Sequence, residues 1–215
     1  MSCAVALEQL LDRYQRCYQS ALGEFPRHYA DGETSVCMLA NEVDDPVQWQ
    51  SVMRPEIASF ANVEAALSLS LHPDIEPFYG RFFAGPVLFD APFGCGELLQ
   101  VWNEADFARL QQNIIGHLMM KQKLKQAPTW FIGVLDGQDE MLTVDNHDGS
   151  VWRERPGDVP CERLADNLAD FLGQLSPRVS EAVRHQQLVD DHGGPDHPGI
   201  FTSLQRMWRN LFPQR

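Results

Sequence analysis

One stretch of the sequence predicts the centre of the architecture: Asn103–Leu135, NEADFARLQQNIIGHLMMKQKLKQAPTWFIGVL. Asn103 is a good helix N-cap, and the acids that follow it favour the positive end of the helix dipole. Apolar residues then recur every three or four positions, which indicates one buried stripe: Phe107, Leu110, Ile114 and Leu118. Pro128 cannot continue the helix. The run Trp130–Leu135 is apolar without alternation, which is typical of a central strand covered on both faces.

Three other features of this predicted helix allow predictions about its packing, its charge and its histidine. Gly116 inside it predicts that another backbone packs close, because glycine there costs about 1 kcal/mol against alanine. Lys121, Lys123 and Lys125 place positive charge where the helix dipole is negative. We interpret His117 as a core or partly exposed histidine and not as a catalytic base.

The flanking segments place the rest of the fold. We expect helices over residues 3–22, 62–71, 74–83 and 160–175. Short strands are expected over 36–39 and 47–52, and paired strands over 87–89 and 98–102. A meander of three strands is expected over 129–135, 140–145 and 150–153. Strands joined by short turns run antiparallel. Because strands cluster instead of alternating with helices, the sequence predicts an α+β fold: a single, mostly antiparallel or mixed sheet packed by helices.

The chain changes character after residue 177. Residues 1–177 are expected to form the α+β domain, and residues 178–215 a C-terminal extension with a linker by composition (190–199) and a helical tail. Apolar residues between Phe201 and Phe212 recur at helical spacing with Arg206 and Arg209 on the other side. This short basic amphipathic helix has three candidate contacts: the acidic body, an anionic membrane surface, or a partner.

Net charge limits the classes of partner. The chain has 215 residues and a formal net charge of −13, which disfavours binding to nucleic acid and attracts basic partners. Residues 1–177 hold 26 acids and 12 Lys or Arg, whereas residues 178–215 hold 4 acids and 5 Arg. No apolar run reaches the length of a membrane span, and the N-terminus lacks the basic start of a secretory signal, so a cytoplasmic location is expected.

The sequence contains no clear catalytic or cofactor-binding motif. The sequence lacks GxSxG, HExxH and a P-loop, and the glycines of residues 93–96 favour a hairpin loop over a phosphate loop. Five scattered cysteines without a CxxC pair argue against a disulfide framework or structural zinc. A histidine- and aspartate-rich part of the extension is one candidate metal cluster, and a metal-dependent enzyme remains an alternative; its residues are His185, Asp190, Asp191, His192, Asp196 and His197. The residues by themselves support no reaction, and we expect no catalytic site, metal or cofactor.

Acids with few neighbouring cations form the candidate binding surface. Six lie within 33 residues whose single cation is Arg81. They are Asp74, Glu76, Asp90, Glu97, Glu104 and Asp106. At helix starts and hairpin ends they can converge at one end of a sheet as a concave acidic surface for a basic partner. A second group marks the turns of the meander: Asp136, Asp139, Glu140, Asp145 and Asp148. A solvated acidic rim is the alternative interpretation of both groups.

The segments 112–133 and 164–172 resemble the bacterial Syd family. The most specific part is Asn113-Ile114-Ile115-Gly116-His117-Leu118, followed by a lysine-rich helix end and Pro128-Thr129-x-Phe131-Ile132. The resemblance extends over roughly residues 5–177, and Val47-x-Trp49, Phe78-Tyr79 and Phe83-Ala84-Gly85 also fit it. It implies a SUKH-like α+β fold without catalytic activity.

The same resemblance implies a partner. Syd proteins are known to bind SecY, a subunit of the SecYEG translocon, and they present an acidic concave surface to basic cytosolic loops of SecY. The chain is therefore expected to be a peripheral protein on the cytoplasmic side of the inner membrane. There it would recognise unassembled or abnormal SecY and negatively regulate the translocase, with residues 200–212 as a possible membrane aid. The alternative is an immunity-type SUKH protein that neutralises a basic toxin nuclease.

Overall fold

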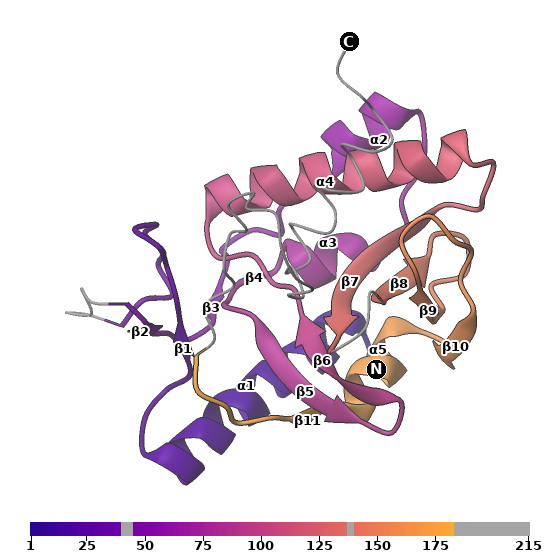
Figure 1. The fold of residues 1–215 in the computed structure, drawn as a ribbon. Helices are drawn as coiled ribbons and strands as arrows, with labels where there is room; N and C mark the ends of the chain where they lie inside the picture. Colours follow the sequence, from indigo (N-terminus) through magenta and orange to yellow (C-terminus); the bar gives the residue numbers. More distant parts are fainter. Residues whose placement is uncertain (40–44, 137–139, 183–215) are drawn as a thin grey trace, which may run out of the picture.

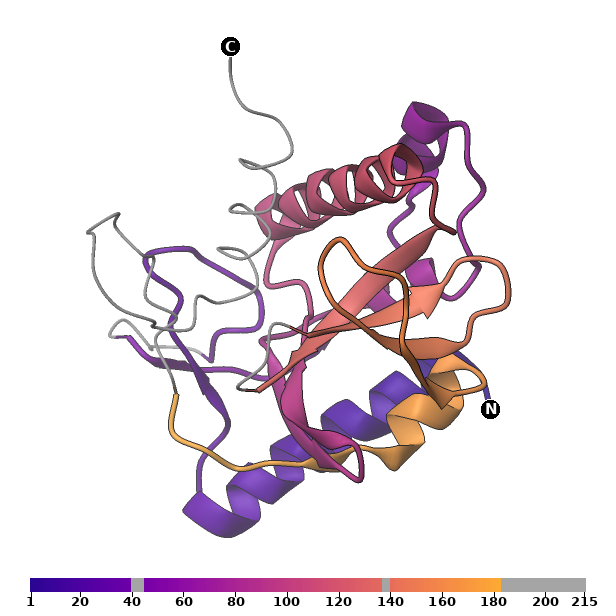
Figure 2. The ribbon, with the colours of Figure 1, turned by 45° about the vertical axis from the view of Figure 1, so that its right-hand side comes forward.

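The computed structural model describes residues 1–39, 45–136 and 140–182. It confirms the predicted α+β architecture, a large curled antiparallel sheet packed by helices (Figures 1 and 2). The helices are α1 (Cys3–Leu22), α2 (Ala61–Leu67), α3 (Ile75–Tyr79), α4 (Glu104–Lys123) and α5 (Leu168–Gln174). α4 and α2 lie on one side of the sheet, and α1 and α5 lie on the other.

The main sheet has seven strands in the order β10-β9-β8-β7-β6-β5-β11, and every neighbouring pair is antiparallel. The strands are β5 (Val87–Ala91), β6 (Gly94–Leu98), β7 (Thr129–Leu135), β8 (Met141–Asp145), β9 (Val151–Glu154), β10 (Glu162–Ala165) and β11 (Ser176–Pro177). Two smaller sheets pair β1 (Arg27–His28) with β2 (Val47–Gln48), and β3 (Val52–Met53) with β4 (Phe82–Phe83). β7 lies in the middle of the main sheet and is buried on both faces, as its apolar run predicted.

The start of α4 forms as predicted. The Asn103 side chain accepts a hydrogen bond from the Asp106 amide at 2.8 Å, and the Asp106 carboxylate accepts one from the Trp102 amide at 2.9 Å. The first hydrogen bond satisfies an amide that the helix leaves without a partner, and the second ties the residue before the cap to the first turn. The stripe on α4 is buried in full: Phe107, Leu110, Ile114 and Leu118. Gly116 is buried as well, and the close approach of another backbone to it stays a prediction.

Two glycines allow β6 and β7 to approach closely. A Cβ on Gly96 would stand 2.2 Å from the carbonyl oxygen of Val134, and one on Gly133 would stand 2.4 Å from that of Glu97. Both distances are impossible for a real side chain, so this pairing requires glycine on each strand. The shift in register between Phe131 and Gly133 places a bulge in β7 at the same point.

Two of the predicted helices are partly wrong, because each includes a segment that is a strand in the structure. The helix expected over 74–83 ends at Tyr79, because Gly80 packs against Ala58, whose amide donates to the Gly80 carbonyl. The following residues form β4 instead. The helix expected over 160–175 is strand β10 followed by α5, because extended Asn167 caps a new helix through the Asp170 amide.

The other differences concern shorter segments. The strands of the predicted hairpin are longer on its turn side, since residues 90–91 and 94–97 pair and only Pro92 and Phe93 connect them; residues 99–102 lie outside the strand. The strand expected over 47–52 is divided between β2 and β3, and residues 36–39 contribute an isolated bridge from Met38 to Trp49. The helix expected over 62–71 runs from Ala61 to Leu67.

A buried polar cluster joins α4 to the sheet. Lys121, which sequence analysis placed among the cations that suit the helix dipole, is fully buried, and its Nζ donates to Glu154 Oε1 on β9 at 2.9 Å. The other carboxylate oxygen accepts hydroxyl hydrogen bonds from Thr129 on β7 at 2.9 Å and Thr143 on β8 at 3.0 Å. One helix and three strands therefore meet at a single carboxylate.

His117 lies one helical turn before Lys121 and completes the cluster. Its Nε2 is 3.0 Å from Thr129 Oγ1, and the ring packs edge-on against Phe131. The side chain is fully buried, as expected for a core histidine. Burial, helped by the charge of Lys121, lowers the pKa of His117 to about 3, so the ring is neutral at physiological pH.

Lys121→Met keeps the length of the side chain but leaves the Glu154 carboxylate buried without its cation. We expect the free energy of unfolding to fall by about 3–5 kcal/mol, as when other buried pairs lose one partner. The control is Lys123→Met in the same helix, where the side chain is exposed and the change should stay within about 0.5 kcal/mol. Urea unfolding followed by circular dichroism measures both, and equal losses would contradict the role of the cluster.

Low pH should destabilise the protein through His117. Between pH 6 and about pH 3 the unfolded chain binds a proton at this residue that the folded chain does not. The free energy of unfolding should therefore fall on acidification by up to about 1.4 kcal/mol per pH unit from this residue. His117→Gln lacks this titration, so urea unfolding at pH 7, 6, 5 and 4 should give a shallower profile. Parallel profiles for variant and wild type would refute the assignment.

Candidate functional site

The six acids predicted to bind a partner lie on three different parts of the fold. Asp74 and Glu76 are at the start of α3, Glu104 and Asp106 are in the first turn of α4, and Asp90 and Glu97 are on β5 and β6. Each pair is described below by its contacts, because a carboxylate that satisfies the fold is less available to a partner.

Asp90 and Glu97 are brought together by the register of the hairpin. Asp90 pairs directly with Cys95, and Leu88 pairs directly with Glu97. Directly paired residues share a face of the sheet, so all four side chains lie on one face, opposite buried Phe89. On that face Asp90 and Glu97 are diagonal neighbours, with α carbons about 7–8 Å apart.

The neighbouring strand adds a third acid to this face. Glu97 pairs with Val134 of β7, and the amide of Asp136 donates to the Cys95 carbonyl at 2.9 Å. Two rows of side chains therefore cross β5, β6 and β7. We call them the outer hairpin face: Leu88, Glu97 and Val134 in one row, and Asp90, Cys95 and Asp136 in the other. Sequence analysis placed Asp136 in the meander group, and only the pairing of β6 with β7 reveals its position.

Arg178 places a positive charge on the outer hairpin face. The guanidinium of Arg178, just after β11, forms an ion pair with the Asp136 carboxylate, and its Nη2 lies 3.4 Å from the Gly96 carbonyl oxygen. The hydrogen bond to Asp136 raises the pKa of Arg178, and the charge of nearby Asp90 acts in the same direction. Residue 178, expected to begin a separate extension, thus contacts the body.

The two acids of α4 have different surroundings. The Glu104 side chain is 70% exposed and accepts a hydrogen bond from Arg54 at 2.7 Å. Arg54 itself is buried, with its guanidinium between the rings of Phe83 and Phe107. Asp106 is mostly covered, and burial raises its pKa despite the Trp102 amide and Arg109. Glu104 therefore faces solvent, whereas Asp106 stabilises the helix start.

The two acids of α3 are engaged within the protein. The Glu76 carboxylate accepts hydrogen bonds from the Ser59 hydroxyl at 2.8 Å and the Phe60 amide at 2.9 Å, at the start of α2. Asp74 lies 3.9 Å from His72 Nδ1 and is 28% exposed. Glu76 thus links α3 to α2, and Asp74 is only partly open to solvent.

The second acidic group is dispersed. Glu140 is buried and pairs with Arg153 and Arg155. Asp145 accepts from the amide of His147 in its own turn, and Asp148 accepts from the amide of Ser150. Asp139 lies outside the described residues. These contacts within the meander leave Asp136 as the member that belongs to the outer hairpin face.

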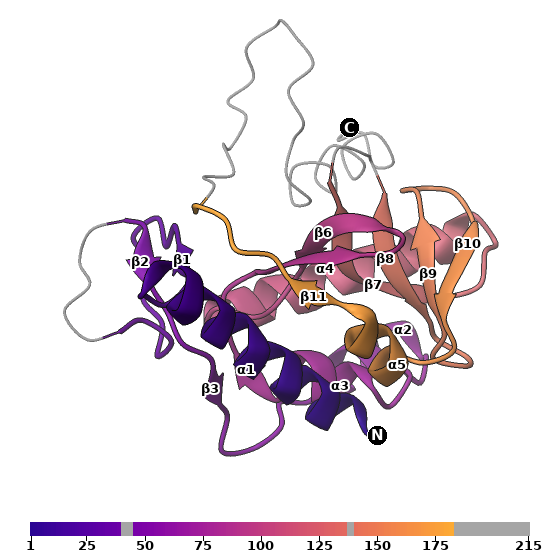
Figure 3. The same ribbon diagram turned by 90° about the horizontal axis from the view of Figure 1, so that it is seen from below.

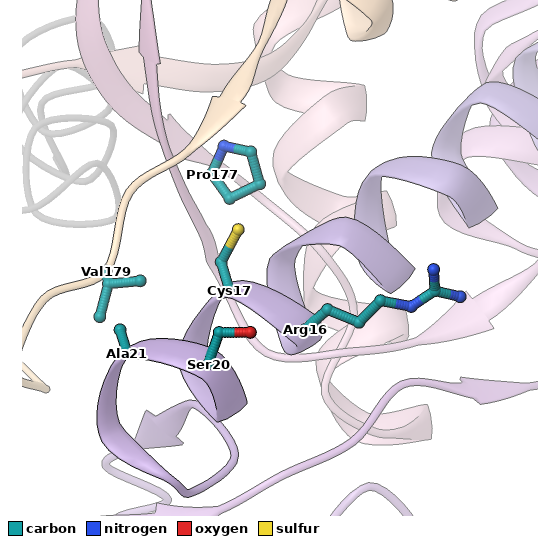
Figure 4. A pocket seen from close by; sticks show the side chains of 6 residues that line it. All are labelled: Arg16, Cys17, Ser20, Ala21, Pro177 and Val179. Carbon is teal, nitrogen blue, oxygen red and sulfur yellow. The ribbon is translucent and has the colours of Figure 1, made fainter.

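An open groove lies between α1 and the segment that follows α5 (Figure 4). Its volume is about 420 Å³, and it is lined by Arg16, Cys17, Ser20, Ala21, Pro177 and Val179. The lining contains no carboxylate or histidine that would activate a nucleophile.

The described part of the chain offers few candidate groups for catalysis or metal binding. No group of three His, Cys, Asp or Glu side chains there is placed to hold a metal ion. The five cysteines are free, and burial raises the pKa of Cys37 to about 11, which disfavours the reactive thiolate. No helix of residues 1–39, 45–136 or 140–182 has the length and apolar character of a membrane span. The candidate metal residues of 185–197 and the amphipathic segment 200–212 lie outside the described residues.

Comparison with known proteins gives consistent matches. Residues 4–177 match the family described as "Syd protein (SUKH-2)". The chain is 58% identical to "Protein Syd" of Shewanella sp. (strain ANA-3) and 57% identical to that of Shewanella sp. (strain MR-7), each over 100% of both chains. Identity to "Protein Syd" of Shewanella baltica (strain OS223) is 55%, again over 100% of both. The similarity to these relatives therefore includes residues 178–215.

The division of the acids into structural and exposed ones is testable. Asp106→Ala removes the acceptor for the Trp102 amide, so we expect the free energy of unfolding to fall by about 1 kcal/mol. Asp106→Asn retains an acceptor oxygen and should lose less. Asp90→Ala changes an exposed side chain and should stay within about 0.5 kcal/mol. Thermal and urea unfolding provide the comparison, and a loss for Asp90→Ala as large as that for Asp106→Ala would overturn this division.

Proposed function

The chain belongs to the Syd family, and on that premise we propose that it binds SecY at the cytoplasmic face of the inner membrane. The proposed partner surface of SecY is its basic cytosolic loops, and the chain is a peripheral protein held at the membrane through this contact. Its role is to recognise unassembled or abnormal SecY and so to regulate the translocase negatively. Binding alone accounts for this role, and no catalytic step is needed.

The observation that carries the proposal is the outer hairpin face. Three carboxylates lie side by side, Asp90 on β5, Glu97 on β6 and Asp136 just after β7, with Arg178 as a neighbouring cation. A body with 26 acids and 12 Lys or Arg in residues 1–177 adds a long-range field that steers a basic partner toward it. Lysine and arginine side chains of a SecY loop are the complementary groups.

We propose two different roles for five of the six predicted acids. Asp90, Glu97 and Glu104 contact the partner directly, since Asp90 and Glu104 are exposed and half-buried Glu97 lies on the same face as Asp90. Glu76 and Asp106 hold the starts of α2 and α4 in place and act on binding through the fold. Residues 200–212 are proposed to assist at the membrane surface, where their arginines suit anionic lipid.

Charge reversal tests this surface. The triple variant Asp90→Lys, Glu97→Lys and Glu104→Lys should weaken binding to SecY-containing membrane vesicles by at least about tenfold, which corresponds to about 1.4 kcal/mol. Its matched control reverses three exposed acids near the opposite edge of the sheet, Asp158, Glu162 and Asp166, and has the same net charge. Co-sedimentation with the vesicles measures both variants after circular dichroism has verified folding.

The two triple variants separate a local surface from overall acidity. Equal weakening would show that net charge alone drives the interaction and would exclude the proposed surface. Raising the salt concentration from 50 to 500 mM should weaken wild-type binding, because exposed charges are screened beyond about 8 Å at physiological ionic strength. Wild-type protein that binds no SecY, but tightly inhibits a basic nuclease, would instead support the immunity alternative for this SUKH-2 family member.

A further inference from the structure

A short segment of the chain covers the edge of the main sheet beside the outer hairpin face. We call Ser176, Pro177 and Arg178 the strap. Ser176 pairs with Asp90 and Pro177 pairs with Phe89 of β5, and the Arg178 amide donates to the Leu88 carbonyl at 3.0 Å. Figures 1 and 3 show β11 alongside β5 and α1. The strap is thus an added antiparallel edge strand.

The strap also places a positive charge among the acids. Side chains alternate along a strand, so Arg178 lies on the same face as Ser176, and therefore on the face of Asp90. From there its guanidinium reaches Asp136 on the far side of β6. In backbone geometry and in charge, the strap has the form of an extended basic peptide bound at this surface.

The strap is held by its pairing with β5 and by the ion pair of Arg178 with Asp136. Pro177 has no amide hydrogen to donate. Ser176 is exposed and Pro177 and Arg178 are half-buried, whereas the preceding Leu175 is only 3% exposed and anchors the end of α5. Among the described residues the covered Nε of Arg178 has no hydrogen-bond partner, which is unfavourable in the bound position. Lifting the strap beyond Leu175 leaves that anchor in place and uncovers the half-buried Pro177 together with Val179, which packs against the core.

A further anchor follows the strap. The Tyr18 hydroxyl on α1 donates to the Ser180 carbonyl at 2.9 Å and accepts from the Ser180 amide at 3.1 Å. These two hydrogen bonds keep the strap close to β5 and favour its return. An occupant that displaces the strap must therefore offer more than the strap does.

We propose, resting on SecY binding as the function, that the edge of β5 is the docking strand for an extended basic segment of the partner, and that this segment replaces the strap. Such a segment repeats the backbone hydrogen bonds of Ser176 and Arg178, as in other strand-addition complexes. A lysine or arginine takes the position of Arg178, and further cations reach Asp90 and Glu97. The strap carries one cation, so a segment with several is favoured over one with a single basic residue.

A disulfide that fixes the strap tests the exchange. Figure 4 shows the sulfur of Cys17 on α1 pointing toward Pro177. In Pro177→Cys the new thiol faces this native cysteine, and mild oxidation should join the strap to α1; peptide mapping by mass spectrometry identifies the bond. The control is the double variant Cys17→Ser with Pro177→Cys, which cannot form it. The probe is inner-membrane vesicles that contain SecY.

We expect the oxidised Pro177→Cys protein to bind these vesicles at least about tenfold more weakly than the same protein after reduction. The control variant should bind equally in both states. Equal binding by the locked and reduced forms would overturn strand exchange while leaving SecY binding intact. Failure of wild-type protein to bind in any state would reject the function, and the docking strand with it.

A second variant tests the charge without a disulfide. Arg178→Ala removes the strap's cation, so it should bind the vesicles about threefold more tightly than wild type at low salt. Arg163→Ala removes an exposed arginine near the other edge of the sheet, makes the same change in net charge and should leave affinity within about twofold of wild type. If Arg178→Ala binds no better than Arg163→Ala, the strap does not compete with the partner.

Discussion

The ion pair between Lys121 and Glu154 is the constraint on which the arrangement of α4 and the sheet depends. A buried carboxylate must be paired and hydrogen-bonded, and here the partners come from α4, β7 and β8 while the carboxylate belongs to β9. The rotation of α4 and its position along β7 are therefore coupled. The start of the same helix presents Glu104 to solvent, so a contact in the interior helps to position a charge on the surface.

Patterns among residues close in sequence predicted the central helix α4 and strand β7, but they did not predict several of the shorter outer elements. The cap at Asn103, the apolar stripe and the run of β7 depend on near neighbours in sequence, so they were predictable. β10 was taken for the first part of a helix because Leu164 fits the spacing of the apolar residues in α5. Its actual state is set by pairing with β9, which sequence patterns do not reveal. The buried ion pair of Lys121 was likewise not predicted, because its partner Glu154 is 33 residues away.

The candidate site, too, could be predicted only in part from the sequence. Composition identified a region rich in acids, but it did not distinguish Glu76 and Asp106, which satisfy backbone amides, from Asp90 and Glu97 on the outer hairpin face. Asp136 joins that face only through the register of β6 with β7. That register in turn depends on Gly96 and Gly133, where any side chain would strike the opposite backbone. The identity of two small residues therefore determines which charges become neighbours.

The covering of β5 by β11 bears on how the protein behaves at high concentration. A bare strand edge displays unpaired amides and carbonyls that a second copy of the chain can extend into a continuous intermolecular sheet. At the opposite edge, β10 carries the exposed charged side chains of Glu162 and Arg163, which oppose such stacking. At β5 a two-residue strand provides the protection. This edge is thus protected from pairing with a second copy by a segment whose own sequence, serine and proline, has little tendency to form sheets.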